Sequence, residues 1–120
     1  MNRKATGDRA EELACRYLKQ RGLRLLSRNY RCRRGEIDLI MRDGDSLVFV
    51  EVRYRRQTAF GRAAETVSAT KQARIIHCAH WYINQHGAWN KPARFDVVCI
   101  EGDLDRGVVQ WLRDAFHPHG

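Results

Sequence analysis

Two short segments of alternating side chains, residues 36–41 and 46–53, constrain the fold of this chain more than any other feature. A repeat of two residues indicates a β-strand, because successive side chains point to opposite faces of a sheet. Between the segments lies Asp43-Gly44-Asp45-Ser46, a sequence typical of a tight hairpin turn. The sequence therefore predicts an antiparallel hairpin, and both of its strands carry carboxylates that are costly to keep among apolar neighbours.

The register of this hairpin decides which charged side chains meet. A two-residue loop of residues 44–45 places Asp38 directly across from Glu51. The same register places Glu36 across from Arg53, with paired Cβ atoms about 5 Å apart. If the loop begins one residue earlier, Glu36 faces Glu51 and Asp38 lies one diagonal away. Either register gathers the carboxylates on one face, whereas a three-residue loop would scatter them.

Carboxylates that face each other across two strands repel, so we expect a positive group between them. Arg53, a divalent cation, or both would serve, since carboxylates bind hard divalent cations and a cation beside them most often handles phosphate. The alternative is an exposed edge hairpin whose acids point into water. Three apolar neighbours on the same face, Ile40, Leu47 and Phe49, favour the buried site.

Residues 6–21 are predicted to form a helix that begins with Thr6 as its N-cap and ends at Gly22. Its apolar stripe has helical spacing and consists of Ala10, Leu13, Ala14, Tyr17 and Leu18. Glu11 falls at the rim of this stripe and can reach into a site, whereas Glu12 is expected to face solvent.

The remaining elements follow from the same periodicities: a strand over 23–30, a loop over 55–66, a helix over 68–86, and strands over 94–100 and 108–112. Ser68 is predicted to cap the second helix, and Lys71 lies on its core side near a loop that could contact substrate. The order αβββαββ, with strands apolar on both faces, predicts a small α/β (α+β) domain in which helices flank a mixed β-sheet.

At 120 residues the chain is expected to form a single domain, residues 1–120, with a core from about 7 to 116 and a loose tail over 117–120. No stretch approaches the roughly 20 apolar residues of a membrane helix, and the N-terminus lacks a signal-peptide core, so we expect a cytoplasmic protein without membrane contact. No Cys-x-x-Cys pair is present, and all cysteines are expected to be reduced thiols.

The net charge of +8 predicts an anionic partner. Arginines with interleaved tyrosine flank the hairpin, and arginine forks suit phosphate groups. The alternative is a solvated basic surface without a specific partner. The predicted nucleic-acid-binding residues are Tyr30, Arg31, Arg33, Arg34, Arg55, Arg56 and Arg62.

Five short motifs spread over residues 7–116 carry a resemblance to a known family. They are Gly7-x-x-Ala10-Glu11-x-x-Ala14-x-x-Tyr17-Leu18, Asn29-Tyr30-Arg31, Gly35-Glu36-Ile37-Asp38-Leu39-Ile40, Phe49-Val50-Glu51-Val52-Arg53 and Arg94-Phe95-Asp96-Val97-Val98. Together they resemble the YraN-like bacterial family, which is regarded as endonuclease-like. The pattern is also similar to the PD-(D/E)XK nuclease superfamily, particularly to the archaeal Holliday-junction resolvases. The combination of the third and fourth motifs is specific to this pattern, whereas Glu-x-Arg alone would be weak evidence for it.

The resemblance implies a restriction-endonuclease-like core in which Asp38 and Glu51 are metal ligands and Glu11 is a helix-borne acid that completes the site. It implies Mg²⁺ or Mn²⁺ as the cofactor and a DNA phosphodiester, in branched or otherwise structured DNA, as the substrate. The sequence leaves RNA open as a partner. Junction-resolving relatives usually work as dimers because two cuts are needed, so a homodimer is one expected state.

One position departs from the family pattern, because Arg53 stands where a lysine is usual. An arginine does not lose its proton usefully, although it can hold a phosphate and stabilise developing charge. Two hypotheses follow: the ion alone activates the attacking water, or Lys71 supplies the missing amine. The rival functions are a catalytically silent nucleic-acid-binding module and an interaction subunit of a DNA-processing complex. The resemblance leaves the roles of Lys71 and Asp96 unsettled.

Overall fold

A computed structural model describes residues 2–56 and 67–118, and it has the predicted order of elements. The elements are α1 (Arg3–Gln20), β1 (Arg24–Cys32), β2 (Gly35–Asp43), β3 (Ser46–Arg55), α2 (Ala69–Gln85), β4 (Ala93–Glu101) and β5 (Val108–Phe116). The strands form one sheet in the order β1-β2-β3-β4-β5. Neighbouring strands are antiparallel except for β3 and β4, which run parallel, so the predicted mixed sheet is confirmed.

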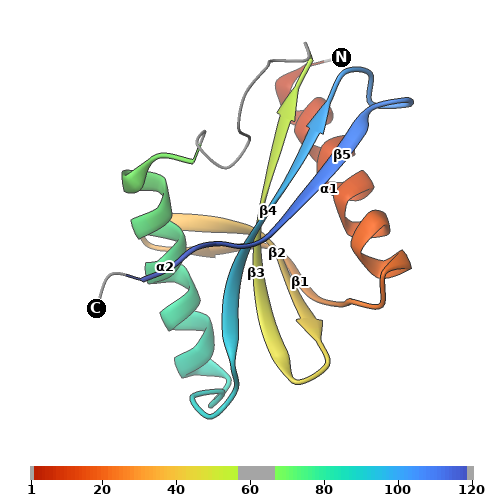
Figure 1. Ribbon diagram of the computed structural model, residues 1–120. Coiled ribbons are helices and arrows are strands. Elements are labelled where there is room, and N and C mark those ends of the chain that lie inside the picture. The colour runs from red at the N-terminus through yellow and green to blue at the C-terminus, as the bar shows by residue number, and fades with distance from the viewer. Residues whose placement is uncertain (1, 57–66, 119–120) are drawn as a thin grey trace.

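The two helices cover opposite faces of the sheet (Figure 1). On one face, Ala14 and Leu18 of α1 pack in a cluster with Met41 and other strand residues. On the other face, Ile75 of α2 packs in a cluster with Phe49 and further aromatic side chains. Because both faces are buried, the strands are apolar on both sides, as the sequence indicated. The predicted α+β architecture, a small mixed sheet flanked by helices, is therefore confirmed.

Of the two hairpin registers that the sequence allowed, the structure has the one with a loop at residues 44–45, because Asp43 pairs with Ser46 and the ladder continues to Leu39 and Val50. Its regular pairing ends there, and the expected direct pairs of Asp38 with Glu51 and of Glu36 with Arg53 are absent from the ladder. The reason is that the part of β2 that precedes Leu39 in the chain pairs only with β1 and has separated from β3.

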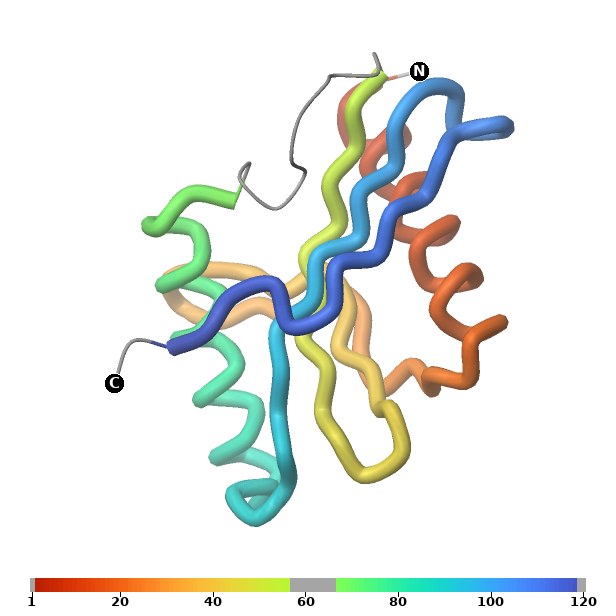
Figure 2. Tube along the Cα trace, viewed as in Figure 1, coloured from red at the N-terminus to blue at the C-terminus, as the bar shows by residue number. Residues whose placement is uncertain are grey.

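The trace in Figure 2 shows the β1–β2 hairpin bending away from β3 towards α2. Asn29 of β1, between the paired residues Arg28 and Tyr30, has a φ of 52°. This left-handed conformation is one that asparagine tolerates, and such an irregularity lets a strand bend. As a result Ile37 joins the α2-side cluster. Strict alternation over residues 36–41 would place Ile37 on the α1 side with Leu39, so the predicted alternation is wrong at this position.

The helix caps are partly as predicted. Ser68 caps α2, and its hydroxyl accepts a hydrogen bond from the Lys71 backbone N–H at 3.1 Å. Thr6 is not the cap of α1, because the helix begins three residues earlier and the Asn2 side chain accepts from the Ala5 N–H at 2.8 Å. Asparagine is as good a cap as threonine, so the earlier start adds about one helical turn without losing the capping bond.

The bend of the β1–β2 hairpin also brings two cysteines together. Cys32 at the end of β1 and Cys78 of α2 form a disulfide, with Cα atoms 5.6 Å apart. The expectation that all cysteines are reduced was therefore wrong for this pair, whereas Cys15 and Cys99 are free and buried. Within the described part of the chain, the helices are too short or too polar to cross a membrane.

Candidate functional site

A cavity of about 850 Å³ lies where β2 separates from β3, next to the last pair of their ladder. It is lined by Arg3, Gly7, Ala10, Glu11, Asp38, Glu51, Val52, Arg53, Tyr54 and Lys71. The lining includes every residue that the sequence proposed for catalysis, contributed by α1, β2, β3 and α2. The separation of the strands explains this gathering, because it lets side chains from helices on opposite faces of the sheet reach one space.

Asp38 is held in place by the backbone of the neighbouring strand. Its Oδ2 accepts a hydrogen bond from the Val52 N–H at 2.8 Å. This bond uses a donor of β3 in the region where regular pairing with β2 has ended. It keeps the Asp38 carboxyl beside Glu51, so the predicted neighbourhood of the two acids exists although they are not a ladder pair.

Glu51 is almost completely buried, with 4% of its side chain exposed. Burial, and then the adjacent Asp38 carboxylate, raise the pKa of Glu51 to about 8. The Lys71 ammonium, 3.4 Å from Glu51 Oε1, opposes this rise in pKa. The carboxyl therefore holds a proton at neutral pH unless more positive charge reaches the cavity.

Glu11 reaches the cavity from α1, as its position at the rim of the apolar stripe predicted. Burial, and then the charge of Asp38, raises the pKa of Glu11 to about 7, while a hydrogen bond to the Asn29 side chain lowers it. Its Oε1 atom is buried without a hydrogen-bond partner among the described residues. A buried oxygen without a partner is costly, so this atom is a candidate contact for a ligand. Glu12 faces solvent as expected and pairs with Arg28 at 2.8 Å.

Asn29 is a member of the site that the sequence reasoning missed as a functional residue. Its side chain hydrogen-bonds Glu11, and its left-handed backbone lies in the bend that opens the cavity. An asparagine in an otherwise regular strand was the available signal, because asparagine is uncommon in strands and tolerates this conformation.

Three cationic residues of the described part of the chain line the cavity, and they come from different elements: Arg3 from α1, Arg53 from β3 and Lys71 from α2. Lys71 lies in the first turns of α2, and 46% of its side chain is exposed next to the buried Glu51. Arg53 follows Glu51 by two residues on β3 and is half-buried at the cavity wall. These positively charged side chains can bind an anionic group, such as a phosphate, that enters the cavity beside the acids.

The carboxylates can be tested for their fit to a divalent ion. Across residues 2–56 and 67–118, no three His, Cys, Asp or Glu side chains are close enough to form a ready-made metal site. Mg²⁺, however, is often held by one or two carboxylates and keeps several of its waters. The adjacent Asp38 and Glu51 meet that requirement, and the unpartnered Oε1 of Glu11 could accept from such a water. The residues present therefore fit a hydrated divalent cation.

The predicted nucleic-acid-binding residues lie in two places. Arg31, Arg33 and Arg34 are exposed at the end of β1 and the following turn, where Arg31 lies 3.9 Å from Glu36. Tyr30 instead packs on α2, and its hydroxyl donates to Gln85 Oε1 at 2.6 Å. A second group lies at the end of β3, where Arg55 is half-buried and Arg56 exposed; Arg62 lies outside the described residues.

Asp96 has a structural role away from the cavity. It is fully buried, and its carboxylate accepts hydrogen bonds from Trp111 Nε1 and the Asp114 N–H, each at 2.9 Å. It also accepts from Arg94 Nε at 3.1 Å. Asp114 has a φ of 55° at a shift in the β4–β5 register. Asp96 therefore holds this bulge of β5 in place.

Comparison with known proteins supports the resemblance seen in the motifs. Residues 10–100 match the model of the uncharacterised protein family UPF0102. A UPF0102 protein of Nitrosococcus oceani is 57% identical over 111 residues, which cover 92% of this chain and 90% of that protein. A UPF0102 protein of Stutzerimonas stutzeri is 50% identical over 113 residues, covering 93% and 94%, and one of Colwellia psychrerythraea is 48% identical over 112 residues, covering 92% and 87%. The chain therefore belongs to the UPF0102 family, the YraN-like proteins that its motifs resemble.

Proposed function

We propose that this protein is a metal-dependent, endonuclease-like hydrolase that acts on phosphodiester bonds of DNA, with branched or structured DNA as the favoured substrate. One observation carries the proposal: Glu11, Asp38, Glu51, Arg53 and Lys71 line one cavity although they come from four elements. Keeping three acids there raises the pKa of two of them to about 7 and about 8. Strongly raised pKa values of neighbouring acids in a cavity are more typical of a functional site than of a structural one.

Asp38 and Glu51 would hold Mg²⁺ or Mn²⁺, and Glu11 would hold one of its waters. Such an ion, when bound, neutralises the acids, polarises a phosphate and lowers the pKa of a water molecule. The bond from the Val52 N–H fixes Asp38 Oδ2, so its other oxygen is the one free to turn to the ion. Glu51 would give up its proton on binding, since added positive charge favours the carboxylate.

Arg53 and Lys71 would then have different roles toward the phosphate. Arg53 keeps its charge at any relevant pH, so it would bind a non-bridging phosphate oxygen and stabilise the charge that develops there. Lys71, now 3.4 Å from Glu51, would be released by the ion to orient the attacking water or contact the phosphate. Lys71 of α2 would thus take the role of the lysine that the family usually has on β3, at the position of Arg53.

A catalytically silent nucleic-acid-binding module is the second candidate. It is favoured by the arginine at position 53 and by the absence, among the described residues, of three acids already arranged as a metal site. It predicts salt-sensitive binding that a chelator leaves unchanged, because the affinity would come from phosphate contacts alone. RNA and a homodimeric state stay compatible with both candidates.

The test is cleavage of end-labelled duplex, single-stranded, flap and four-way-junction DNA with Mg²⁺ or Mn²⁺. Three variants accompany the parent: Asp38→Asn, Arg53→Lys and, as a matched control, Glu36→Gln, whose acid lies on the same strand outside the cavity. Cleavage by the parent and by Glu36→Gln that is lost in Asp38→Asn supports the hydrolase. Cleavage only in Arg53→Lys, or binding without cleavage in every variant, supports the silent module.

A further inference from the structure

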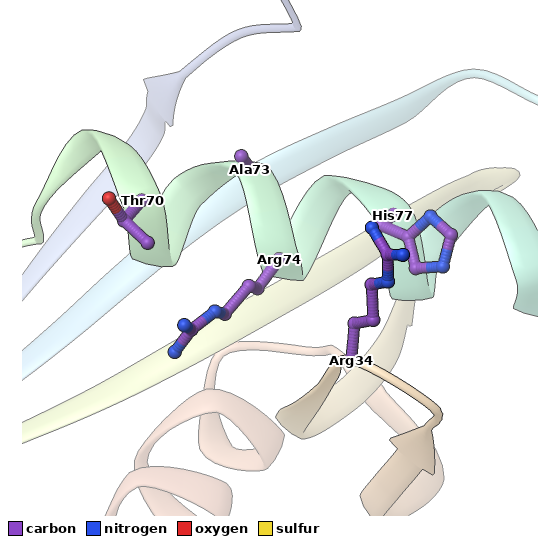
Figure 3. Close-up of a pocket in the computed structure, with 5 residues that line it drawn as sticks. All are labelled: Arg34, Thr70, Ala73, Arg74 and His77. Atoms are coloured by element: carbon purple, nitrogen blue, oxygen red, sulfur yellow. The ribbon is translucent and has the colours of Figure 1, made fainter.

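A second basic hollow lies beside the catalytic cavity, between α2 and the turn that joins β1 to β2. It measures about 660 Å³ and is lined by Arg34, Thr70, Ala73, Arg74 and His77. Figure 3 shows Arg34 rising from the turn towards His77, while Arg74 extends from the helix on the same side. We call this hollow the α2 groove. Neither the motifs nor the proposed function assigned a role to Arg74, Thr70 or His77.

The polar groups of the α2 groove are hydrogen-bond donors or can act as donors. Arg34 and Arg74 each carry a guanidinium fork, which suits the paired oxygens of a phosphate. Thr70 adds a hydroxyl at the start of α2, where the helix dipole also favours an anion and the first turn carries no acid. Trp81 Nε1 donates to His77 Nε2 at 3.2 Å, which leaves Nδ1 of that ring as its donor.

The turn and the helix that form the groove are held closely together. A disulfide joins Cys32, just before the turn, to Cys78, the residue after His77. A Cβ atom on Gly35 would lie 3.1 Å from Arg74 Cβ, so only glycine allows this approach without displacement. The backbone that carries Arg34 is therefore held next to the helix, so the two walls of the groove are in place before a ligand binds.

The groove continues from the catalytic cavity along α2. Lys71 lines the cavity and Thr70, its neighbour in sequence, lines the groove. From Lys71 the basic and polar groups follow at Arg74 and His77 at intervals of three residues, so they wind around α2 by about 120° as they pass from the cavity to the groove. The rise from Lys71 to His77 is roughly 9 Å, which is long enough for the cavity and the groove to contact different phosphates of one strand.

We infer that the α2 groove binds the backbone phosphates of the nucleic-acid strand on one side of the phosphodiester that enters the cavity. This inference rests on the proposed function, because it takes the cavity as the place of the scissile phosphate. The groove supplies affinity and position without base contacts, since its donors are suited to phosphate oxygens. Single-stranded or unpaired ends would fit it best, because one strand alone has to follow the helix.

The experiment measures binding of a fluorescein-labelled single-stranded DNA by anisotropy, in EDTA and over a series of salt concentrations. Arg34→Ala combined with Arg74→Ala removes two phosphate contacts. Its slope of log affinity against log salt should fall by about 1.4, at about 0.7 for each contact. The matched control is Arg16→Ala with Arg106→Ala, which removes the same charge from exposed sites on α1 and in the β4–β5 turn.

Three outcomes decide the inference. A loss of slope in the groove variant but not in the control supports it, and Arg74→Lys alone should then keep the slope because the charge remains. Equal slopes in the groove variant and the parent overturn it, even if the parent cleaves DNA. If the parent never cleaves with any metal but the groove variant alone loses slope, the hydrolase fails and the groove stands. Thermal unfolding of each variant confirms that it is folded.

Discussion

Replacing the buried acid of the cavity should stabilise the metal-free protein. Glu51→Gln keeps the size of the side chain and mimics the protonated form that burial and Asp38 favour. In the folded state the pKa of Glu51 is about 8, against an ordinary value of 4.5. The folded protein therefore binds more protons than the unfolded chain between these pH values, and its stability falls as the pH rises through them. Glutamine has no proton to lose in this pH range, so the stability of the variant should not fall in this way.

The size of the effect follows from the same pKa. A rise from 4.5 to about 8 corresponds to roughly 5 kcal/mol as an upper limit, at about 1.4 kcal/mol for each pH unit. Because the Lys71 side chain beside Glu51 is half-exposed, solvent should screen part of the charge, and we expect a gain of about 2–3 kcal/mol above pH 8. At pH 5 the gain should be below about 1 kcal/mol, because wild-type Glu51 is still protonated there.

The assay is urea unfolding of the parent and of Glu51→Gln at pH 5, 7 and 9 in EDTA. The control is Glu36→Gln, which removes an exposed acid that lies 3.9 Å from Arg31. Surface ion pairs contribute at most about 1 kcal/mol, so this control should change little at any pH. A gain from Glu51→Gln that is the same at pH 5 and pH 9, or a loss of stability at pH 9, would refute the reasoning.

Three further predictions concern the fold. Cys32→Ser with Cys78→Ser opens a cross-link that spans 46 residues and should cost about 4 kcal/mol in urea unfolding, an effect that reductant reproduces in the parent but not in the variant. Asp96→Asn should cost about 3 kcal/mol, because an amide nitrogen would face the donors that the carboxylate now accepts; a loss below about 1 kcal/mol would contradict its role in the β5 bulge. Asn2→Ala should cost about 1 kcal/mol through the lost α1 cap, measured by thermal unfolding, whereas equal stability would mean that the cap contributes nothing.

The hairpin and the composition of the cavity could be predicted from the sequence because both depend on local rules. A side-chain period of two and the turn around Gly44 fix which residues of β2 and β3 are neighbours. The position of Glu11 at the rim of its helix stripe likewise follows from the helical repeat. These rules hold as long as each element is regular.

The bend of the β1–β2 hairpin could not be predicted by such rules, and it is the cause of three of the wrong predictions. It ends the ladder before Asp38, moves Ile37 to the other face and brings Cys32 to α2. The bend depends on how β2 packs against α2 and on the left-handed Asn29, neither of which has a periodic signal. The cavity forms because of this bend. The sequence could therefore predict which residues line the cavity but not how they are arranged in it.

The most direct test of the central claim is Mn²⁺ binding, measured by electron paramagnetic resonance on the parent, Asp38→Asn and Glu36→Gln in the presence of a DNA oligonucleotide. We predict binding of Mn²⁺ by the parent and by Glu36→Gln, and a loss of affinity of at least about tenfold in Asp38→Asn, because one of two direct carboxylate ligands is removed. Equal binding by the parent and Asp38→Asn, or no binding by the parent, would contradict a metal site at this cavity.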